Sequence, residues 1–209
     1  YGTQGGTLDS LCTAGADSLR RGAIEGAVLR FEDALRIDQG YAPAHAHLGY
    51  VHLRLGDLKA AEARFLRAIR SDPRLTEAHT GLGRVYAQMP YRKVDGIRCF
   101  QKALSLDRTC VEAQYHLALT HLKLGNLDAK KAFKELLRMD PGHPDASFRL
   151  GTILERHDKD NLAAAAEYER QLSSNPSHAE ARGRLAEIYR KLGRYPDALR
   201  VIEAPRSGN

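Results

Sequence analysis

Cysteine is scarce in this sequence and is not spaced for metal binding or for a disulfide framework. Three cysteines, Cys12, Cys99 and Cys110, occur among 209 residues. An odd number of cysteines without a CxxC pair supports neither a disulfide scaffold nor a zinc knuckle. Cys99 precedes an aromatic residue, and we expect it to act as a small buried apolar residue. The count is compatible with a reducing compartment but does not require one.

Long apolar runs are also absent. Apolar residues make up 43% of the chain, enough for a sizeable core, yet no stretch approaches the roughly 18 apolar residues of a membrane-spanning helix. No signal-peptide pattern is visible at the start. The first residue is Tyr1, so we expect a fragment or a processed chain. The compartment stays open: a cytoplasmic location is favoured, and an extracytoplasmic one is compatible with a removed signal.

The chain lacks a dominant charge and a recognisable catalytic motif. Its 32 basic residues are interspersed with 26 acidic ones, for a net charge of +6. Without a basic stripe or an aromatic RNA-binding motif, nucleic acid is not an expected partner. There is no GxSxG nucleophile motif and no GxxxxGK[ST] phosphate loop. The sequence therefore predicts no catalytic residue and no cofactor.

Nine histidines are present, but none forms a tight helical pair of the HExxH kind that binds zinc. Four of them occupy two recurring positions of the repeat described next, where we expect packed or half-exposed side chains rather than metal ligands. These are His45, His52, His79 and His121.

What the chain does have is a set of large residues at a nearly regular spacing. They are separated by 34, 35, 33, 35 and 34 residues, and we call them the anchors: Phe31, Phe65, Phe100, Phe133, Tyr168 and Ile202. Four residues before each anchor stands a very small residue: Ala27, Ala61, Gly96, Ala129, Ala164 and Ala198. A fixed period of this length indicates a repeat array, in which each unit buries its apolar face against its neighbours.

Each repeat reads as a pair of helices. The apolar period is helical within a repeat, as in the stripe of Leu48, Val51 and Leu55. Small residues at the eighth and twentieth positions would let two helices approach closely. The predicted units span residues 8–41, 42–75, 76–110, 111–143, 144–178 and 179–205. We expect residues 1–7 to be a flexible linker or tag remnant, and residues 206–209 to be a polar tail.

Turn and cap signals separate the helices. Four units carry a glycine between their helices, each in the position that ends a helix in a left-handed conformation: Gly22, Gly56, Gly125 and Gly193. Pro90 and Asp158 replace this glycine in the two units that are one residue longer, so we expect those turns to differ in shape. Capping boxes are predicted at Thr109 with Glu112 and at Ser177 with Glu180.

These residues resemble the tetratricopeptide repeat (TPR) family over almost the whole chain. The second unit has Leu48-Gly49 at positions seven and eight, Ala61 at twenty and Phe65 at twenty-four. Position four departs from the family's large aromatic, and holds His45, His79, Gln114 or Ser147. The resemblance implies an all-α solenoid of about twelve antiparallel helices in a right-handed superhelix. A 35-residue RNA-binding repeat fits less well, because it lacks the Leu-Gly and Ala signature.

The resemblance also implies the function: a non-catalytic protein–protein interaction scaffold that binds a peptide in a concave groove. The alternative is an accessory docking domain of a larger enzyme or of a transport or secretion assembly. The carboxylate clamp of co-chaperone members of the family is absent here. Mid-helix arginines and neighbouring aromatics in the groove are the residue types that carry binding energy at interfaces. The candidate peptide contacts are Tyr50, Arg84, Tyr115, Phe148, Arg149 and Arg184.

We expect the bound peptide to have some acidic character, the alternative being a solvated face whose aromatics pack sideways. The last helix has no separate capping helix after it. Either Arg194, Asp197 and Arg200 make this helix its own cap, or more protein follows, or a second copy packs there. The oligomeric state and the partner stay open.

Overall fold

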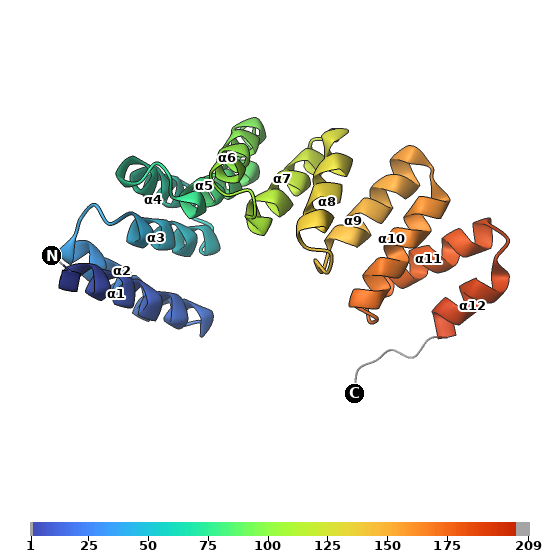
Figure 1. Cartoon of the computed structure of the whole chain (residues 1–209), viewed down its shortest axis with the longest axis horizontal. Coiled ribbons are helices and arrows are strands. Elements are labelled where there is room, and N and C mark those ends of the chain that lie inside the picture. Colours follow the sequence, from blue (N-terminus) through green and yellow to red (C-terminus); the bar gives the residue numbers. More distant parts are fainter. Residues whose placement is uncertain (1, 204–209) are drawn as a thin grey trace. The chain divides into compact units, whose positions relative to one another are not determined.

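The computed structural model describes residues 2–203, and side chains from residue 6 onward. Over this range the chain forms twelve α-helices, as predicted, and no strands (Figure 1). They are α1 (Gly2–Arg20), α2 (Ile24–Ile37), α3 (Ala42–Arg54), α4 (Leu58–Ser71), α5 (Thr76–Gln88), α6 (Lys93–Leu106), α7 (Val111–Lys123), α8 (Asp128–Met139), α9 (Ala146–Ile153), α10 (Asn161–Ser174), α11 (Ala179–Lys191) and α12 (Tyr195–Glu203). A π-helical turn, η1 (Leu154–Asp158), extends α9.

The chain divides into two compact units between Thr120 and His121. We call Tyr1–Thr120 the N-terminal unit and His121–Asn209 the C-terminal unit. The prediction of a single superhelical array from residue 8 to residue 205 stays a prediction, and each unit is described by itself.

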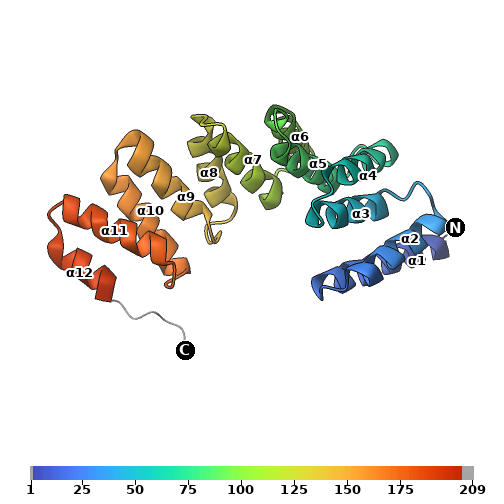
Figure 2. The ribbon, with the colours of Figure 1, turned by 180° about the vertical axis from the view of Figure 1, so that it is seen from behind.

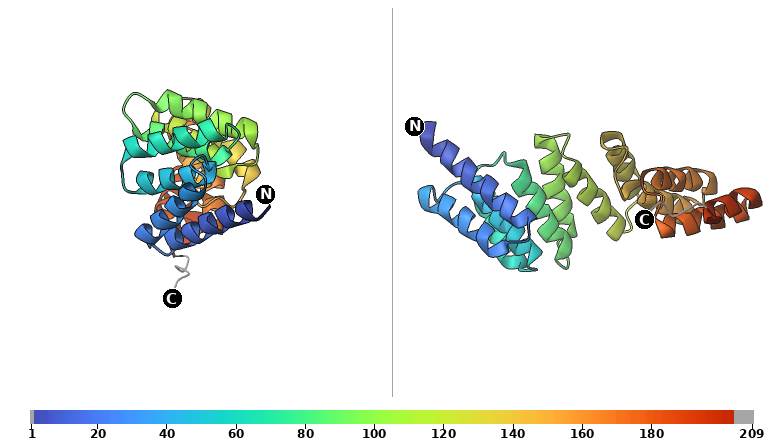
Figure 3. Two further views of the ribbon diagram at one scale, coloured as in Figure 1. Left: turned by 90° about the vertical axis from the view of Figure 1, so that its left-hand side faces the viewer. Right: turned by 90° about the horizontal axis from the view of Figure 1, so that it is seen from below.

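Within each unit, consecutive helices pack in antiparallel pairs. The N-terminal unit contains the pairs α1–α2, α3–α4 and α5–α6, and α3 also contacts α1 and α5 (Figures 1 and 2). In the C-terminal unit α9 pairs with α10 and α11 with α12, while α8 packs on α9 (Figure 3). Because α3 contacts both α1 and α5, the side chains of these first helices share one face of the N-terminal unit.

The anchors form the core of each unit. Phe31, Phe65, Phe100, Phe133 and Tyr168 are fully buried. The small residues let the helices approach these rings: a Cβ added to Gly49 would lie 2.8 Å from the ring of Phe65. A Cβ on Gly81, from the next pair, would lie 2.2 Å from the same ring. Close packing of this kind leaves no room for even one methyl group.

Two sequence expectations about the ends of the chain were wrong. The anchor Ile202 is 58% exposed rather than buried, because no described helix follows α12 to cover it. Residues 2–7 are not a linker but the first turns of α1. Extending an existing helix fixes one residue for each new hydrogen bond, which costs far less than starting a helix. Tyr1, Pro205 and the predicted tail at 206–209 lie outside the described residues.

The turns within the helix pairs confirm the glycine prediction. The four predicted glycines have φ values from 65° to 81°, the left-handed region that only glycine enters without strain. In the two longer units this conformation falls one residue after Pro90 and Asp158, on Tyr91 (φ 64°) and Lys159 (φ 54°). The extra residue therefore shifts the left-handed position along the chain, and before Lys159 it is absorbed by η1.

The turns between pairs are built on a side chain that the sequence analysis missed. Five second helices, α2, α4, α6, α8 and α10, end at an Asp or Asn whose side-chain oxygen accepts the backbone N–H two residues later: Asp38, Asp72, Asp107, Asp140 and Asn175. Such Asx turns compete well with helix continuation. They also explain why the predicted capping boxes were wrong. The hydroxyls of Thr109 and Ser177 donate to Asp107 and Asn175, and the following helices begin at Val111 and Ala179.

Candidate functional site

The N-terminal unit carries an acidic hollow of about 910 Å³ on the face shared by its first helices. Its walls come from the middle of α1, from the N-terminal parts of α3 and α5, from the start of α7 and from the turns before α3, α5 and α7. Its charged and titratable lining residues are Asp9, Asp72, Glu77, Asp107, Glu112, Arg74, His47, Tyr41, Cys12 and Cys110. Five carboxylates therefore face a single arginine.

Two groups in the wall of the acidic hollow are held in their neutral forms. Burial, with Asp9 nearby, raises the pKa of the Cys12 thiol to about 11. Burial and a hydrogen bond to Asp9 raise the pKa of the Tyr41 hydroxyl, which donates to that carboxylate. The thiol is thus not a reactive thiolate near neutral pH. The negative charge of the hollow comes from its carboxylates alone.

Tyr50 and Arg84, two of the predicted peptide contacts, contact each other and bond to Glu77 and Glu112, which line this hollow. The Arg84 guanidinium lies 5.4 Å from the centre of the Tyr50 ring and donates to Glu112 at 2.7 Å. The Tyr50 hydroxyl donates to the backbone oxygen of Glu77 at 3.0 Å, and its ring meets Phe65 edge-on. Arg84 is thus held by a carboxylate and an aromatic face of its own unit.

Tyr115, the third candidate of the N-terminal unit, lies on α7. Its ring centre is 5.4 Å from that of His116, and His116 in turn stacks on the anchor Phe100. Tyr115 is half-buried, so part of its ring remains accessible.

Phe148 and Arg149, in the C-terminal unit, differ in exposure although they are adjacent on α9. Phe148 is only 8% exposed and packs between Tyr168 and His178, with ring centres 5.8 and 4.6 Å away. The Arg149 guanidinium donates to Asp145 at 2.7 Å and is about two-fifths exposed. Phe148 therefore contributes mainly to packing, whereas Arg149 reaches the surface.

Arg184 belongs to a polar cluster around Glu155 of η1. The Glu155 carboxylate is 11% exposed and accepts hydrogen bonds from Arg184 at 3.2 Å and from the Tyr168 hydroxyl at 2.9 Å. Arg184 also reaches Glu180 at 3.2 Å. Burial and this carboxylate raise the pKa of Tyr168 to about 12. The three candidate arginines are thus each joined to carboxylates of their own unit.

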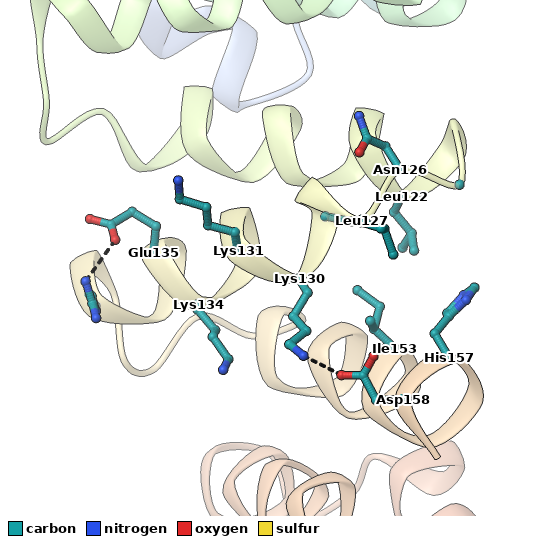
Figure 4. Close-up of a pocket in the computed structure, with 13 residues that line it drawn as sticks. Leu122, Asn126, Leu127, Lys130, Lys131, Lys134, Glu135, Ile153, His157 and Asp158 are labelled. Atoms are coloured by element: carbon teal, nitrogen blue, oxygen red, sulfur yellow. Dashed lines mark hydrogen bonds and ion pairs between the residues drawn. The ribbon is translucent and has the colours of Figure 1, made fainter. Parts of the chain in front are cut away.

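A second hollow, of about 460 Å³, runs along α8 in the C-terminal unit (Figure 4). We call it the α8 hollow. In Figure 4, Leu122 and Leu127 lie on one side of it, and Ile153, His157 and Asp158 lie on the other. Sequence reasoning missed this site, although the lysines of α8 and the unusual turn at Asp158 were visible in the sequence.

The described side chains offer no metal site: no group of three or more His, Cys, Asp or Glu residues among them could hold a metal ion. The histidines at position four instead replace an aromatic by a buried hydrogen-bonding ring. His45 and His79 each bond a backbone oxygen six residues earlier at 3.0 Å. None of the described helices is both long and apolar enough to cross a membrane.

The repeated helix pairs define an α-solenoid, a class of fold that presents extended surfaces to other macromolecules. Three family models described as tetratricopeptide repeat match the sequence: one at residues 18–89 and 155–207, one at 128–171 and one at 112–143. The chain belongs to the tetratricopeptide repeat family. Members of this family are generally non-catalytic scaffolds for protein interactions, so its expected partners are proteins or peptides.

Solved structures show the same fold. PilF of Pseudomonas aeruginosa is 21% identical with a TM-score of 0.85, over 95% of this chain and 90% of that one. PilW, described as a widely conserved type IV pilus biogenesis factor, is 20% identical with a TM-score of 0.77, over 93% and 90%. YrrB, described as a TPR protein with an unusual peptide-binding site, is 22% identical with a TM-score of 0.63, over 82% and 88%. No curated protein sequence matches the chain significantly.

Proposed function

We propose that this chain is a non-catalytic scaffold that binds a peptide segment of a partner protein in its concave groove. The observation that carries the proposal is the acidic hollow, which is formed by the first helices of successive repeats and is large enough, at about 910 Å³, for several side chains. YrrB, with the same fold, is described as having a peptide-binding site, which supports this reading.

The charge of the lining residues favours a basic peptide in the N-terminal unit. Five carboxylates and one arginine line the acidic hollow, and like charges brought together at an interface cost free energy. The sequence-based expectation of an acidic peptide depended on arginines that are joined to carboxylates, such as Arg84 with Glu112. An acidic segment would have to displace those carboxylates. We therefore propose Lys or Arg side chains opposite Glu77.

The test is a selection from a displayed library of random twelve-residue peptides against the full chain. We expect a basic class among the enriched peptides, and Glu77→Lys to weaken the binding of that class about tenfold, the factor that corresponds to 1.4 kcal/mol. Glu25→Lys, which makes the same change at an exposed position of α2, is the matched control. Their affinity should also fall with added salt.

Two outcomes would contradict this proposal. Enriched peptides that are acidic, and that lose affinity when Arg149 and Arg184 are changed to Glu, would restore the sequence-based expectation. If no enriched peptide responds to changes in the groove, peptide binding in the groove is wrong.

A second candidate function is that of a docking subunit in a transport or secretion assembly. Both PilF and PilW match more than nine-tenths of this chain with nine-tenths of their own length, and PilW is described as a type IV pilus biogenesis factor. Chemical cross-linking in the native host tests it. Cross-links to components of an envelope assembly support this function, and cross-links confined to other proteins contradict it.

A further inference from the structure

We propose that the α8 hollow is a second docking site, for a partner segment that presents a large apolar side chain flanked by carboxylates. The site is separate from the proposed groove, because most of its walls come from the second helix of a repeat and from a turn, not from the face shared by the first helices. The proposal depends on the apolar floor of the hollow, on the wall that η1 supplies and on the charges at its rim.

The apolar floor consists of Leu122 from the end of α7, Leu127 just before α8, Ala129 from α8, and Ile153 from α9. Leu127 is 88% exposed, the largest exposure of any leucine among the described residues. Covering so exposed a leucine with a partner removes apolar surface from water, which favours binding. The hollow lies in the size range of about 300–1,000 Å³ that is typical of ligand sites.

The wall opposite α8 exists because the repeat is irregular there. The fifth repeat is one residue longer than the standard repeat, and the π-helical turn η1 absorbs the extra residue. Lys159 then takes the left-handed conformation and ends the turn. This arrangement places His157 and Asp158 beside the floor, with the Lys130 ammonium on α8 paired to Asp158 (Figure 4). Single π-turns within α-helices are frequent at functional sites.

The rim along α8 is positively charged. Lys130, Lys131, Lys134 and Arg138 follow one helical stripe. Lys130 is paired with Asp158, and Arg138 with Glu135. Among the described residues, no carboxylate lies within ion-pair distance of Lys131 or Lys134, and both line the hollow. Carboxylates of a partner could therefore pair with these two lysines without displacing any existing partner.

These features select one class of occupant. An apolar floor demands a Leu-, Ile- or Phe-like side chain, and the two unpaired lysines demand flanking Asp or Glu. A peptide segment meets both requirements, and it suits a family whose members bind proteins. The same chemistry could be met by a small amphiphilic anion such as a fatty acid, which the experiment distinguishes.

The experiment selects twelve-residue peptides from a displayed random library on the full chain after depletion on the variant Lys131→Glu/Lys134→Glu. Enriched peptides are synthesised with a fluorescent label, and their affinities are measured by anisotropy. We expect an apolar residue flanked by Asp or Glu, and at least tenfold weaker binding to that variant and to Leu127→Ser. The matched control is Arg67→Glu/Arg70→Glu, the same charge change on exposed residues of α4 in the N-terminal unit. Circular dichroism checks that each variant is folded.

The outcomes separate this inference from the proposed function. Peptides that depend on Lys131, Lys134 and Leu127 but not on Glu77 support the α8 hollow, whatever the acidic hollow binds. The inference is overturned if no enriched peptide depends on these residues, or if the peptides that do are basic. It is also overturned if labelled oleate binds in a manner that depends on Lys131 and Lys134 while no peptide does.

Discussion

The two units are built on the same helix-pair repeat but carry hollows of opposite charge. In the N-terminal unit, five carboxylates line the face formed by the first helices. In the C-terminal unit, four cations line a hollow beside the second helix α8. The anchors and their small neighbours are shared by both units and are buried in both, with the exception of Ile202. The residues that maintain the repeat therefore do not determine what each unit can bind.

The difference between the units arises where the repeat is broken or left free to vary. Glu77 and Glu112 occupy a first-turn position, where an acidic side chain also complements the helix dipole. These charges are therefore compatible with the helices, and both line the acidic hollow. In the C-terminal unit η1 absorbs the extra residue before Lys159, and η1 supplies one wall of the α8 hollow. Variable charges and one insertion are thus enough to give one fold two surfaces.

The largest expected effect concerns the packing that the two units have in common. Gly81→Ala in the N-terminal unit should lower the free energy of unfolding by about 1–3 kcal/mol, because the new methyl group would overlap the buried ring of Phe65. Gly183→Ala in the C-terminal unit meets nothing within 4 Å, and should raise it by up to about 1 kcal/mol through helix propensity. Urea unfolding followed by circular dichroism measures both changes.

This pair of glycines also tests whether the units respond separately. Both lie near the middle of a first helix, so the backbone effect of the substitution is matched. Hydrogen exchange should place the loss of protection from Gly81→Ala in α3–α6 and leave α11 unchanged. Equal effects of the two substitutions would show that ring contact does not decide the result. A loss of protection spread over both units would show that they unfold together.

A smaller effect should come from the two left-handed turn positions that are not glycine, one in each unit. Tyr91 and Lys159 pay a steric cost that glycine avoids, and both side chains are exposed, so little packing is lost. Tyr91→Gly and Lys159→Gly should each raise the free energy of unfolding by about 0.5–1 kcal/mol. Gly56→Ala, at φ 79°, is the opposite control and should lower it by about 1 kcal/mol. Thermal midpoints of the variants check these expectations.

The two turns also sharpen the comparison of the units. If Lys159→Gly lowers peptide affinity at the α8 hollow while Tyr91→Gly leaves it unchanged, then η1 holds the wall of that hollow through its terminal conformation. A stabilising effect of only one of the two substitutions would indicate that the other turn gains compensating contacts.

Most of the fold could be predicted from the sequence, because the signals for it are periodic. A buried ring such as Phe65 needs small residues opposite it, and both recur every 34 residues or so. The turn glycines are equally direct signals, because glycine adopts the left-handed conformation at little steric cost and other residues do not. The capping boxes failed because Asp107 and Asn175, two residues earlier, offer stronger local hydrogen bonds to Thr109 and Ser177. Local competition of this kind is visible only when all acceptors near a turn are compared.

The candidate sites were less predictable, because exposure and pairing depend on neighbours that are distant in the sequence. The position of Arg184 in its predicted helix suggested that its guanidinium was available to a peptide. In the structure it binds Glu155, which is 29 residues earlier in the sequence. Phe148 occupies a predicted groove position but is buried against Tyr168 and His178. The α8 hollow needs a wall from η1, and no periodic pattern predicts where an inserted residue will be absorbed.

The smallest expected effect is a pH dependence in the N-terminal unit. The His47 ring stacks on Phe31 with ring centres 4.9 Å apart, and its burial lowers its pKa below the ordinary value of 6.5, against a smaller opposing effect of Glu77. Burial also lowers the pKa of His45, despite its bond to the oxygen of Gln39. Protons therefore bind the unfolded chain more readily than the folded one below pH 6.5.

The consequence is a loss of stability on acidification. The histidine contribution to the stability of the N-terminal unit should be fully present above pH 6.5. It should be lost as the pH falls toward the lowered pKa values of His45 and His47. His47→Phe keeps an aromatic ring on Phe31 and should make the urea midpoint less dependent on pH between 7.5 and 5. His157→Gln removes an exposed histidine of the C-terminal unit and controls for the loss of one titratable ring. An unchanged pH dependence in His47→Phe would assign the acid sensitivity to other groups.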